Sequence, residues 1–444
     1  MVQLVNNITT RLGGITGNQL IVIITLWITM FFSYFIQEPI YLVMFRLESE
    51  LHATKQTIQR IGIWFVISLS LSRIFIGPCL ITRMLPSSMV ILSLLLSYLS
   101  LSLSLLSFIP IFKSISFFTL CIIMTGASLG PLWTNCMYIA SKIIFKEGYY
   151  HHAGVIFGGL STSQYFGAYF CDKIFTYVSD YYQWKYYFLL LFPFVLIMAT
   201  MNLTMSKQWW IAGTMVNFED SYKEDDLPCC KEICINILKY MINARVIFSS
   251  AIVCGTKLLS NLVLEEYPKY LHETLSVPTN ISYLLSILFK CGCIIGAILI
   301  GAYIDKSAPN RYLIINAKVL SVLGILLISM FLCSNLIFSK IIVFLFGVIL
   351  SGSESVMSSM IPIRIAEHYE TSILMMFSIC NGYSMLLNML FRSFLDIGMF
   401  ELSSVATVEM TFVIVFFMIL FLALSADHYM QLKCRRIEHW TLKR

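Results

Sequence analysis

Six charged side chains deep inside the long apolar stretches of this chain are its strongest candidates for binding chemistry. A charge inside an apolar, membrane-spanning segment costs on the order of several kcal/mol unless it pairs or faces water, so each is a candidate site. Cations facing one cavity would attract an anion, because a bound anion relieves the unfavourable burial of an unpaired positive charge. The six are Glu38, Arg73, Lys257, Lys290, Glu354 and Arg392.

Pairing among these charges is the structural alternative. Glu38 would pair with Lys290, and Glu354 with Arg392 or with Lys257. A paired charge serves packing, whereas a charge that lines a cavity serves binding. The residues by themselves leave both interpretations open.

Enzymatic chemistry has little support in the sequence. No nucleophile–base or metal-ligand constellation stands out among the apolar stretches. Cys229, Cys230 and Cys234 lie together in a polar loop, but the other half of a zinc site is missing. We therefore expect a protein that is not an enzyme and holds neither a cofactor nor a metal.

The composition is that of a membrane protein. Charged residues make up 12% of the 444 residues, against roughly 25% in a soluble globular chain. Hydrophobic residues make up 58%, and the mean hydropathy is +0.81. The net charge of +6 is scattered between the apolar stretches, which argues against a nucleic-acid partner. The expected partners are the lipid bilayer and a small-molecule solute.

The apolar stretches predict an all-α membrane protein with about twelve membrane-spanning helices, since a span needs roughly 20 apolar residues. One long polar break near the midpoint divides them into two halves, a pattern typical of transporters. The predicted domains are an amino-terminal bundle (1–205), a central loop (206–245), a carboxy-terminal bundle (246–425) and a tail (426–444). The predicted spans are 19–45, 61–82, 89–111, 115–140, 153–175, 185–205, 246–264, 281–304, 312–335, 339–363, 371–395 and 405–425.

Basic residues concentrate in loops on one side of the predicted spans. The positive-inside rule therefore predicts that both termini and the central loop are cytoplasmic. Within the loop, the segment 232–244 could form a short surface helix. Small residues predict close helix approach in the fifth and eighth spans, at Gly154, Gly158, Gly159, Gly167, Gly292, Gly296 and Gly301.

Short motifs are spread over most of the chain. They are Tyr34, Ser72-Arg73 with Gly77, Trp133, Leu160-Ser-Thr-Ser163 with Gly167, Gly255-x-Lys257, Tyr267-Pro, and Gly301-Ala-Tyr-Ile-Asp305-Lys306 with Arg311. Together these motifs resemble the organophosphate:phosphate antiporter family of the major facilitator superfamily. Each motif is short, and the loop motif after the eighth span is the most specific for the superfamily.

This resemblance implies a major facilitator fold of two six-helix bundles that exchanges a sugar phosphate for inorganic phosphate by alternating access. Arg73 and Lys257 would anchor the anion, because a phosphate group needs fixed cations. Tyr34, Gln37 and Ser163 would donate or accept hydrogen bonds. The resemblance also suggests the endoplasmic reticulum membrane, although other membranes stay open.

The loop motif implies a cytoplasmic latch made by Asp305, Lys306 and Arg311. In the corresponding loop of the first half, the position of the acidic residue is occupied by Ile81. We therefore expect the latch in the second half only.

The chain departs from the family at the end of its first span. Gln37 and Glu38 stand where the family has Arg and Lys, and Lys290 stands where it has an acidic residue. A neutral solute therefore remains an alternative, carried by a proton-coupled or facilitative transporter in which Glu38 or Glu354 takes the proton. A carrier that no longer transports and acts as a sensor or scaffold is a further alternative. The substrate and the oligomeric state are left open, and a monomer is compatible with the sequence.

The two reversed charges give a first prediction, that Glu38 and Lys290 form a salt bridge acting as a gate or strut between the bundles. Glu38→Lys and Lys290→Glu should each impair transport, because each leaves two like charges facing one another. The double swap should restore it, measured as solute uptake into proteoliposomes. A double variant no better than the single variants would rule the pairing out.

Overall fold

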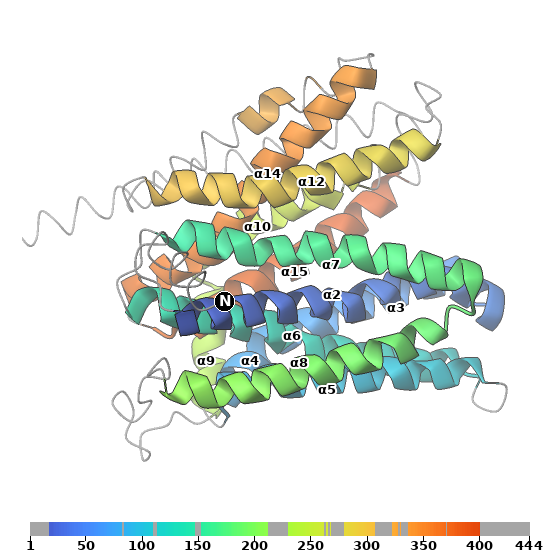
Figure 1. Cartoon of the computed structure of the whole chain (residues 1–444), viewed down its shortest axis with the longest axis horizontal. Coiled ribbons are helices and arrows are strands. Elements are labelled where there is room, and N and C mark those ends of the chain that lie inside the picture. The colour runs from blue at the N-terminus through green and yellow to red at the C-terminus, as the bar shows by residue number, and fades with distance from the viewer. Residues whose placement is uncertain are drawn as a thin grey trace, which may run out of the picture. The chain divides into compact units, whose positions relative to one another are not determined.

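The computed structural model describes residues 17–81, 84–109, 113–146, 152–211, 230–261, 263–264, 267, 279–306, 322–326, 329, 336–369 and 371–399. Throughout these ranges the regular structure is helical, and no strand occurs in them. Figure 1 shows the long helices of the chain. The predicted all-α class is confirmed.

The described part of the first half consists mainly of long helices. Its second helix changes character within the span: α3 passes into one turn of π-helix, η1, and then into α4. The elements are α2 (Gly17–Leu51), α3 (Lys55–Leu71), η1 (Ser72–Ile76), α4 (Gly77–Ile81), α5 (Pro86–Ser104), the short helix η2 (Leu105–Phe108), α6 (Ile115–Lys146), α7 (Ala153–Tyr181) and α8 (Tyr186–Ile211).

The second half begins after a short helix in the central loop, α9, which covers most of the helix expected at 232–244 but ends at Met241. The described elements are α9 (Cys230–Met241), α10 (Ala244–Asn261), α12 (Thr279–Asp305), α14 (Leu336–Tyr369) and α15 (Ile373–Met399).

Helices coincide with every predicted span except the ninth and the twelfth. The twelfth, 405–425, lies outside the described residues, and the ninth, 312–335, is described only at 322–326 and 329. Within the described ranges, 8 helices are long and apolar enough to cross a membrane, or 9 if the bent pair α9–α10 forms one span. Helix α7 is not among them, and it carries Asp172, Lys173 and Asp180 besides many small residues.

The chain forms two compact units, each with its own core. The predicted domain boundaries at 205 and 246 stay predictions. The compact units do not follow the two halves of the chain strictly, because each unit includes one short segment from the other half. Unit 1 consists of Met1–His151, Gly159–Met241 and Ala366–Leu386. Unit 2 consists of His152–Gly158, Ile242–Ile365 and Leu387–Arg444.

Within unit 1, α6 packs against α3, η1 and α5, and α8 packs against α2 and α5 (Figure 1). Two glycines of α6 bring its backbone close to α3 and η1. A Cβ on Gly126 would lie 2.8 Å from the carbonyl oxygen of Phe65, and one on Gly130 would lie 2.7 Å from that of Leu69. A larger residue at either position would push α6 away, and with it the surface that faces Arg73.

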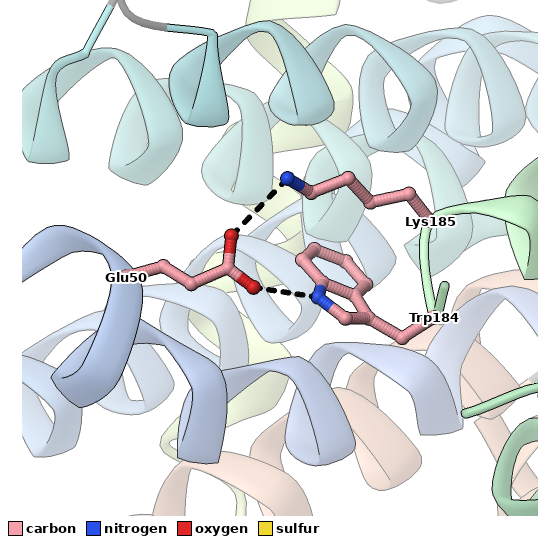
Figure 2. Close-up of polar contacts among 3 residues, drawn as sticks. All are labelled: Glu50, Trp184 and Lys185. Atoms are coloured by element: carbon pink, nitrogen blue, oxygen red, sulfur yellow. Dashed lines mark hydrogen bonds and ion pairs between the residues drawn. The ribbon is translucent and has the colours of Figure 1, made fainter. Parts of the chain in front are cut away.

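A polar cluster ties the end of α2 to the turn before α8, and Figure 2 shows it. The Nε1 of Trp184 donates to Oε1 of Glu50 over 2.7 Å, and Nζ of Lys185 lies 3.1 Å from Oε2 of Glu50. The Trp184 ring is 7% exposed and meets the Phe108 ring edge-on, with centroids 5.0 Å apart. One carboxylate therefore fixes both the indole and the ammonium group at this turn.

Removing the indole of Trp184 tests that cluster. Trp184→Phe keeps a ring in the packed site but leaves the Glu50 carboxylate without its 2.7 Å partner. We expect the free energy of unfolding to fall by about 1 kcal/mol, because Glu50 is partly exposed and water replaces part of the lost hydrogen bond. Thermal unfolding of the detergent-solubilised protein measures it. Trp64→Phe is the matched control, since Trp64 is 50% exposed, and an equal effect of both substitutions would contradict the cluster's role.

Candidate functional site

Arg73 is a buried cation of unit 1. It lies in η1 and is 8% exposed. Its Nε donates to the carbonyl oxygen of Gly130 over 3.3 Å, and its Nη1 contacts Sδ of Met385 at 3.1 Å. Its guanidinium carbon also lies 5.4 Å from the centroid of the Trp133 ring. Groups from α6 and α15 therefore hold the arginine in place.

These partners of Arg73 are all uncharged. A carbonyl, a thioether and an indole ring surround the guanidinium, and none of its partners among the described residues is a carboxylate. An arginine has five N–H donors, and these contacts use two of them. Among the residues that the structure describes, no partner neutralises the charge of Arg73, and the contacts above leave several of its donors over.

The π-helical turn η1 sets the position of Arg73 against α6. A π-turn inserts one residue into an α-helix, and such turns recur at functional sites. Ser72, the first residue of η1, donates its hydroxyl to the carbonyl oxygen of Ala127 on α6. The turn is thus bonded to α6 twice, by Ser72 at Ala127 and by Arg73 at Gly130.

Tyr34 and Ser163, two predicted hydrogen-bonding residues, lie on α2 and α7 of the same unit. The Oη of Tyr34 donates to Oε1 of Gln164 over 3.2 Å, and Tyr34 lies within electrostatic range of Arg73. The hydroxyl of Ser163 is fully buried and donates to the carbonyl oxygen of Leu160 over 2.6 Å. The structure thus brings Tyr34 near Arg73, while the Ser163 proton is used within its own helix.

Two polar residues next to Ser163 were missed by sequence reasoning. Gln164 holds Tyr34, and Thr162 accepts a hydrogen bond of 3.0 Å from the indole N–H of Trp27. The signal was present as a polar run, Ser161 to Gln164, in an otherwise apolar span. Met385, the thioether partner of Arg73, carries no such signal, because a methionine in a span looks like any other apolar residue.

Gln37 and Glu38 are half-buried on α2 beside Pro39, a proline inside the helix. Glu38 acts electrostatically on Tyr187 of α8, whose hydroxyl donates to the carbonyl oxygen of Phe35 over 3.2 Å. Gln37 and Glu38 lie in unit 1, on the helix that also carries Tyr34.

The remaining predicted charges belong to unit 2. Lys257 on α10 and Lys290 on α12 are half-buried, and Glu354 on α14 is 8% exposed. The pairings of Glu38 with Lys290, and of Glu354 with Lys257 or Arg392, stay predictions. The side chain of Arg392 and the whole of Arg311 lie outside the described residues.

Asp305 caps a helix within unit 2. Its Oδ1 accepts from the backbone N–H of Gly154 over 2.6 Å, and its Oδ2 accepts from that of Val155 over 2.8 Å. Both amides are in the first turn of α7, where the helix has free N–H groups and a partial positive charge. Asp305 itself is the last residue of α12, and the neighbouring Lys306 is exposed.

Glycines allow this contact between α12 and the start of α7. A Cβ on Gly154 would collide with the carbonyl oxygen of Gly301, and one on Gly158 with that of Ala297. Close approach is confirmed for six of the seven glycines expected to permit it. Gly159 is the exception, because nothing lies within 4 Å of the position that a Cβ would occupy there. Helix α7 then continues from residue 159 as part of unit 1.

Comparison with known proteins decides the family. The family model described as "Major Facilitator Superfamily" matches residues 26–389. The chain belongs to the Major Facilitator Superfamily. No curated protein sequence matches the chain. As a superfamily member it is a secondary transporter of a small molecule and a multi-pass protein of the lipid bilayer, not an enzyme.

Solved structures agree with the superfamily fold. The chain is similar to the proton:xylose symporter XylE bound to 6-bromo-6-deoxy-D-glucose, with a TM-score of 0.65 and 11% identity over 93% of this chain and 95% of that one. It is also similar to a double-tryptophan variant of XylE, with a TM-score of 0.66 and 13% identity over 93% and 94% of the two chains. The predicted major facilitator fold is thereby confirmed.

The Asp305 cap gives a prediction. Asp305→Asn keeps the shape of the side chain but removes the charge that two α7 amides donate to. Hydrogen exchange at Gly154 and Val155 should become about tenfold faster, which corresponds to about 1.4 kcal/mol. Asp180→Asn on the exposed surface of α7 is the control and should leave these amides unchanged. Equal exchange in Asp305→Asn and the wild type would mean that Asp305 does not hold the helix.

Proposed function

We propose that this superfamily member transports a small organic anion, and that the anion is a sugar phosphate exchanged for inorganic phosphate. The observation that carries the proposal is the buried Arg73 with its uncharged partners. A guanidinium kept charged in an apolar span is unfavourable, and an anionic ligand offsets that cost. Its planar fork of donors matches the oxygens of a phosphate or carboxylate group.

The other groups assigned to the anion are Lys257, as a second cation, and Gln37, Tyr34 and Ser163, as hydrogen-bonding partners. Gln164 supports the proposal by holding the Tyr34 hydroxyl, which lies within electrostatic range of Arg73. We further propose that Asp305 with Lys306 and Arg311 forms a cytoplasmic latch. The cap that Asp305 makes on α7 supports this role, since a latch needs a bond that can open.

The site proposed for the anion has few fixed cations. Gln37 supplies hydrogen bonds but no charge where the resembling family has an arginine. This shortage favours a second candidate, a proton-coupled or facilitative transporter of a non-phosphorylated solute. In that case a half-buried Glu38 or the buried Glu354 would take the proton. The cytoplasmic termini and an endoplasmic reticulum location also remain part of the proposal.

Counterflow in proteoliposomes separates the two candidates. Vesicles preloaded with inorganic phosphate should take up labelled glucose 6-phosphate, and uptake should stop when phosphate is omitted. Under the second candidate, uptake of an uncharged sugar would instead follow an imposed pH gradient. Absence of phosphate-dependent exchange by a protein that elutes as a folded species would overturn the proposed cargo.

Arg73 provides the sharpest variant for this assay. Arg73→Lys keeps the charge but loses the bidentate fork, and Arg73→Gln loses the charge as well. We expect exchange to fall about tenfold in Arg73→Lys and further in Arg73→Gln, because charge-assisted hydrogen bonds of about 1.5–3 kcal/mol are lost.

Arg60→Gln is the matched control, since Arg60 is exposed on α3, one turn beyond its start. It should exchange phosphate at the wild-type rate. If Arg73→Gln also exchanged at that rate while remaining folded, Arg73 would not be an anion anchor.

A further inference from the structure

Two cysteines far apart in the sequence lie together in unit 1. The Sγ atoms of Cys79 on α4 and Cys234 on α9 are 3.9 Å apart, and 155 positions separate the two residues. Neither cysteine is part of a disulfide, and both are half-buried. Most other described cysteines are fully buried, among them Cys136, Cys171 and Cys254. The pair is therefore reachable by a small reagent in a way that the core cysteines are not.

Helix α9 is docked on the bundle. It contacts both η1 and α4, and Figure 1 shows its label beside that of α4. Its inner face is apolar: Ile237 is fully buried and Ile233 is 7% exposed. At its far end, the rings of Tyr240 and Tyr369 lie 5.8 Å apart. The Cys79–Cys234 contact is thus one of several that hold α9 against the helix carrying Arg73.

The two halves of the chain secure their helix ends by different means. The end of α12 carries Asp305, which bonds the first turn of α7. The end of α4 is Ile81, which has no polar group on its side chain to make such a bond. Helix α9 contacts α4, as α5 and α6 also do, and the Sγ of Cys234 on α9 lies beside the Sγ of Cys79.

We propose that Cys79 and Cys234 form a reversible, redox-sensitive pair whose oxidation fastens α9 to α4. A Cys thiolate attacks a small disulfide such as oxidised glutathione, forming a mixed disulfide and releasing one glutathione thiolate. The second cysteine then displaces the second glutathione. One Sγ–Sγ bond forms in the protein, the glutathione disulfide is reduced to two thiols, and the two cysteine protons pass to the glutathione thiolates or to water.

The geometry requires only a modest movement. A disulfide has sulfur atoms about 2 Å apart, so the two Sγ atoms must approach by roughly 2 Å. Rotation of both side chains about their Cα–Cβ bonds, with a small shift of the short helix α9, covers that distance. On the side of the membrane predicted to be cytoplasmic, glutathione keeps the pair reduced until the surroundings become oxidising.

Fastening α9 has a consequence for the transport cycle. α9 ends at Met241 and α10 begins at Ala244, so this helix is the last element of the connection into unit 2. A major facilitator protein works by movement of its halves, and a bond from α9 to α4 shortens the free length of that connection. Oxidation therefore slows the carrier. This step rests on the transporter function of the superfamily and not on the proposed anion.

A cleavage assay on the full chain detects the bond without any solute. A protease recognition sequence is inserted between residues 212 and 229, so that cleavage separates Cys79 from Cys234. The solubilised protein is treated with oxidised glutathione, blocked with N-ethylmaleimide and then cleaved. We expect the two fragments to stay joined on a non-reducing gel and to separate after dithiothreitol. Fragments that separate without reduction would overturn the proposal.

Matched variants identify the two sulfur atoms. Cys79→Ser and Cys234→Ser should each abolish the joined band, because serine keeps the size of the side chain but cannot be oxidised in this way. Cys291→Ser, at an exposed cysteine of α12, should keep it. A joined band that survives in Cys234→Ser would assign the bond to another cysteine and refute the pair.

Hydrogen exchange then tests the fastening itself. Oxidation of the wild type should slow exchange of the α9 amides at least fivefold, and dithiothreitol should reverse the change. Cys234→Ser should show no response to the oxidant. A wild type that forms the bond but exchanges α9 amides equally fast in both states would show that the bond fastens nothing. Because neither readout uses a transported solute, failure of the proposed cargo would leave both results unaffected.

Discussion

The constraint on which this structure depends is that backbone N–H and C=O groups in an apolar medium must bond within their own segment. An unsatisfied group in hydrocarbon costs several kcal/mol, so only helices and closed barrels cross membranes. Here the described spans are helices, and the exceptions to α geometry are short, such as η1 and η2. Each helix satisfies its own backbone, so what remains for packing is the fit of one helix surface against the next.

That fit is made by small residues in this chain. Gly126 and Gly130 bring α6 onto α3 and η1 in unit 1, and Gly154 and Gly158 bring α7 onto α12 in unit 2. Lipid tails are as apolar as leucine, so helices in a membrane associate by close packing and hydrogen bonds rather than by the hydrophobic effect. The same close approaches position the functional groups. Arg73 reaches the Gly130 carbonyl only because α6 lies so near to η1. Asp305 reaches the α7 amides because Gly154 and Gly158 bring the start of α7 close to α12.

Charge is then used sparingly and at defined places. The Glu50 carboxylate serves Trp184 and Lys185 at a helix end, where water reaches it. The Asp305 carboxylate neutralises the positive end of a helix. Arg73 differs from both, since its partners in the described chain are uncharged. A cation held in that way is the feature on which the proposed anion site rests.

The sequence by itself determined the solvent, the helical class and nearly all of the spans, because runs of about 20 apolar residues leave a backbone few alternatives to a helix. It also located the superfamily, most of the short helix α9 and six glycines of close approach in the fifth and eighth spans, but not Gly126 and Gly130 of α6. Only the tertiary structure decided what each polar group meets: Met385 at Arg73, Gln164 at Tyr34, and Cys234 at Cys79. These partners come from different helices. Local patterns specify a helix and its faces, whereas the rotation and depth at which two helices pack depend on all their side chains together.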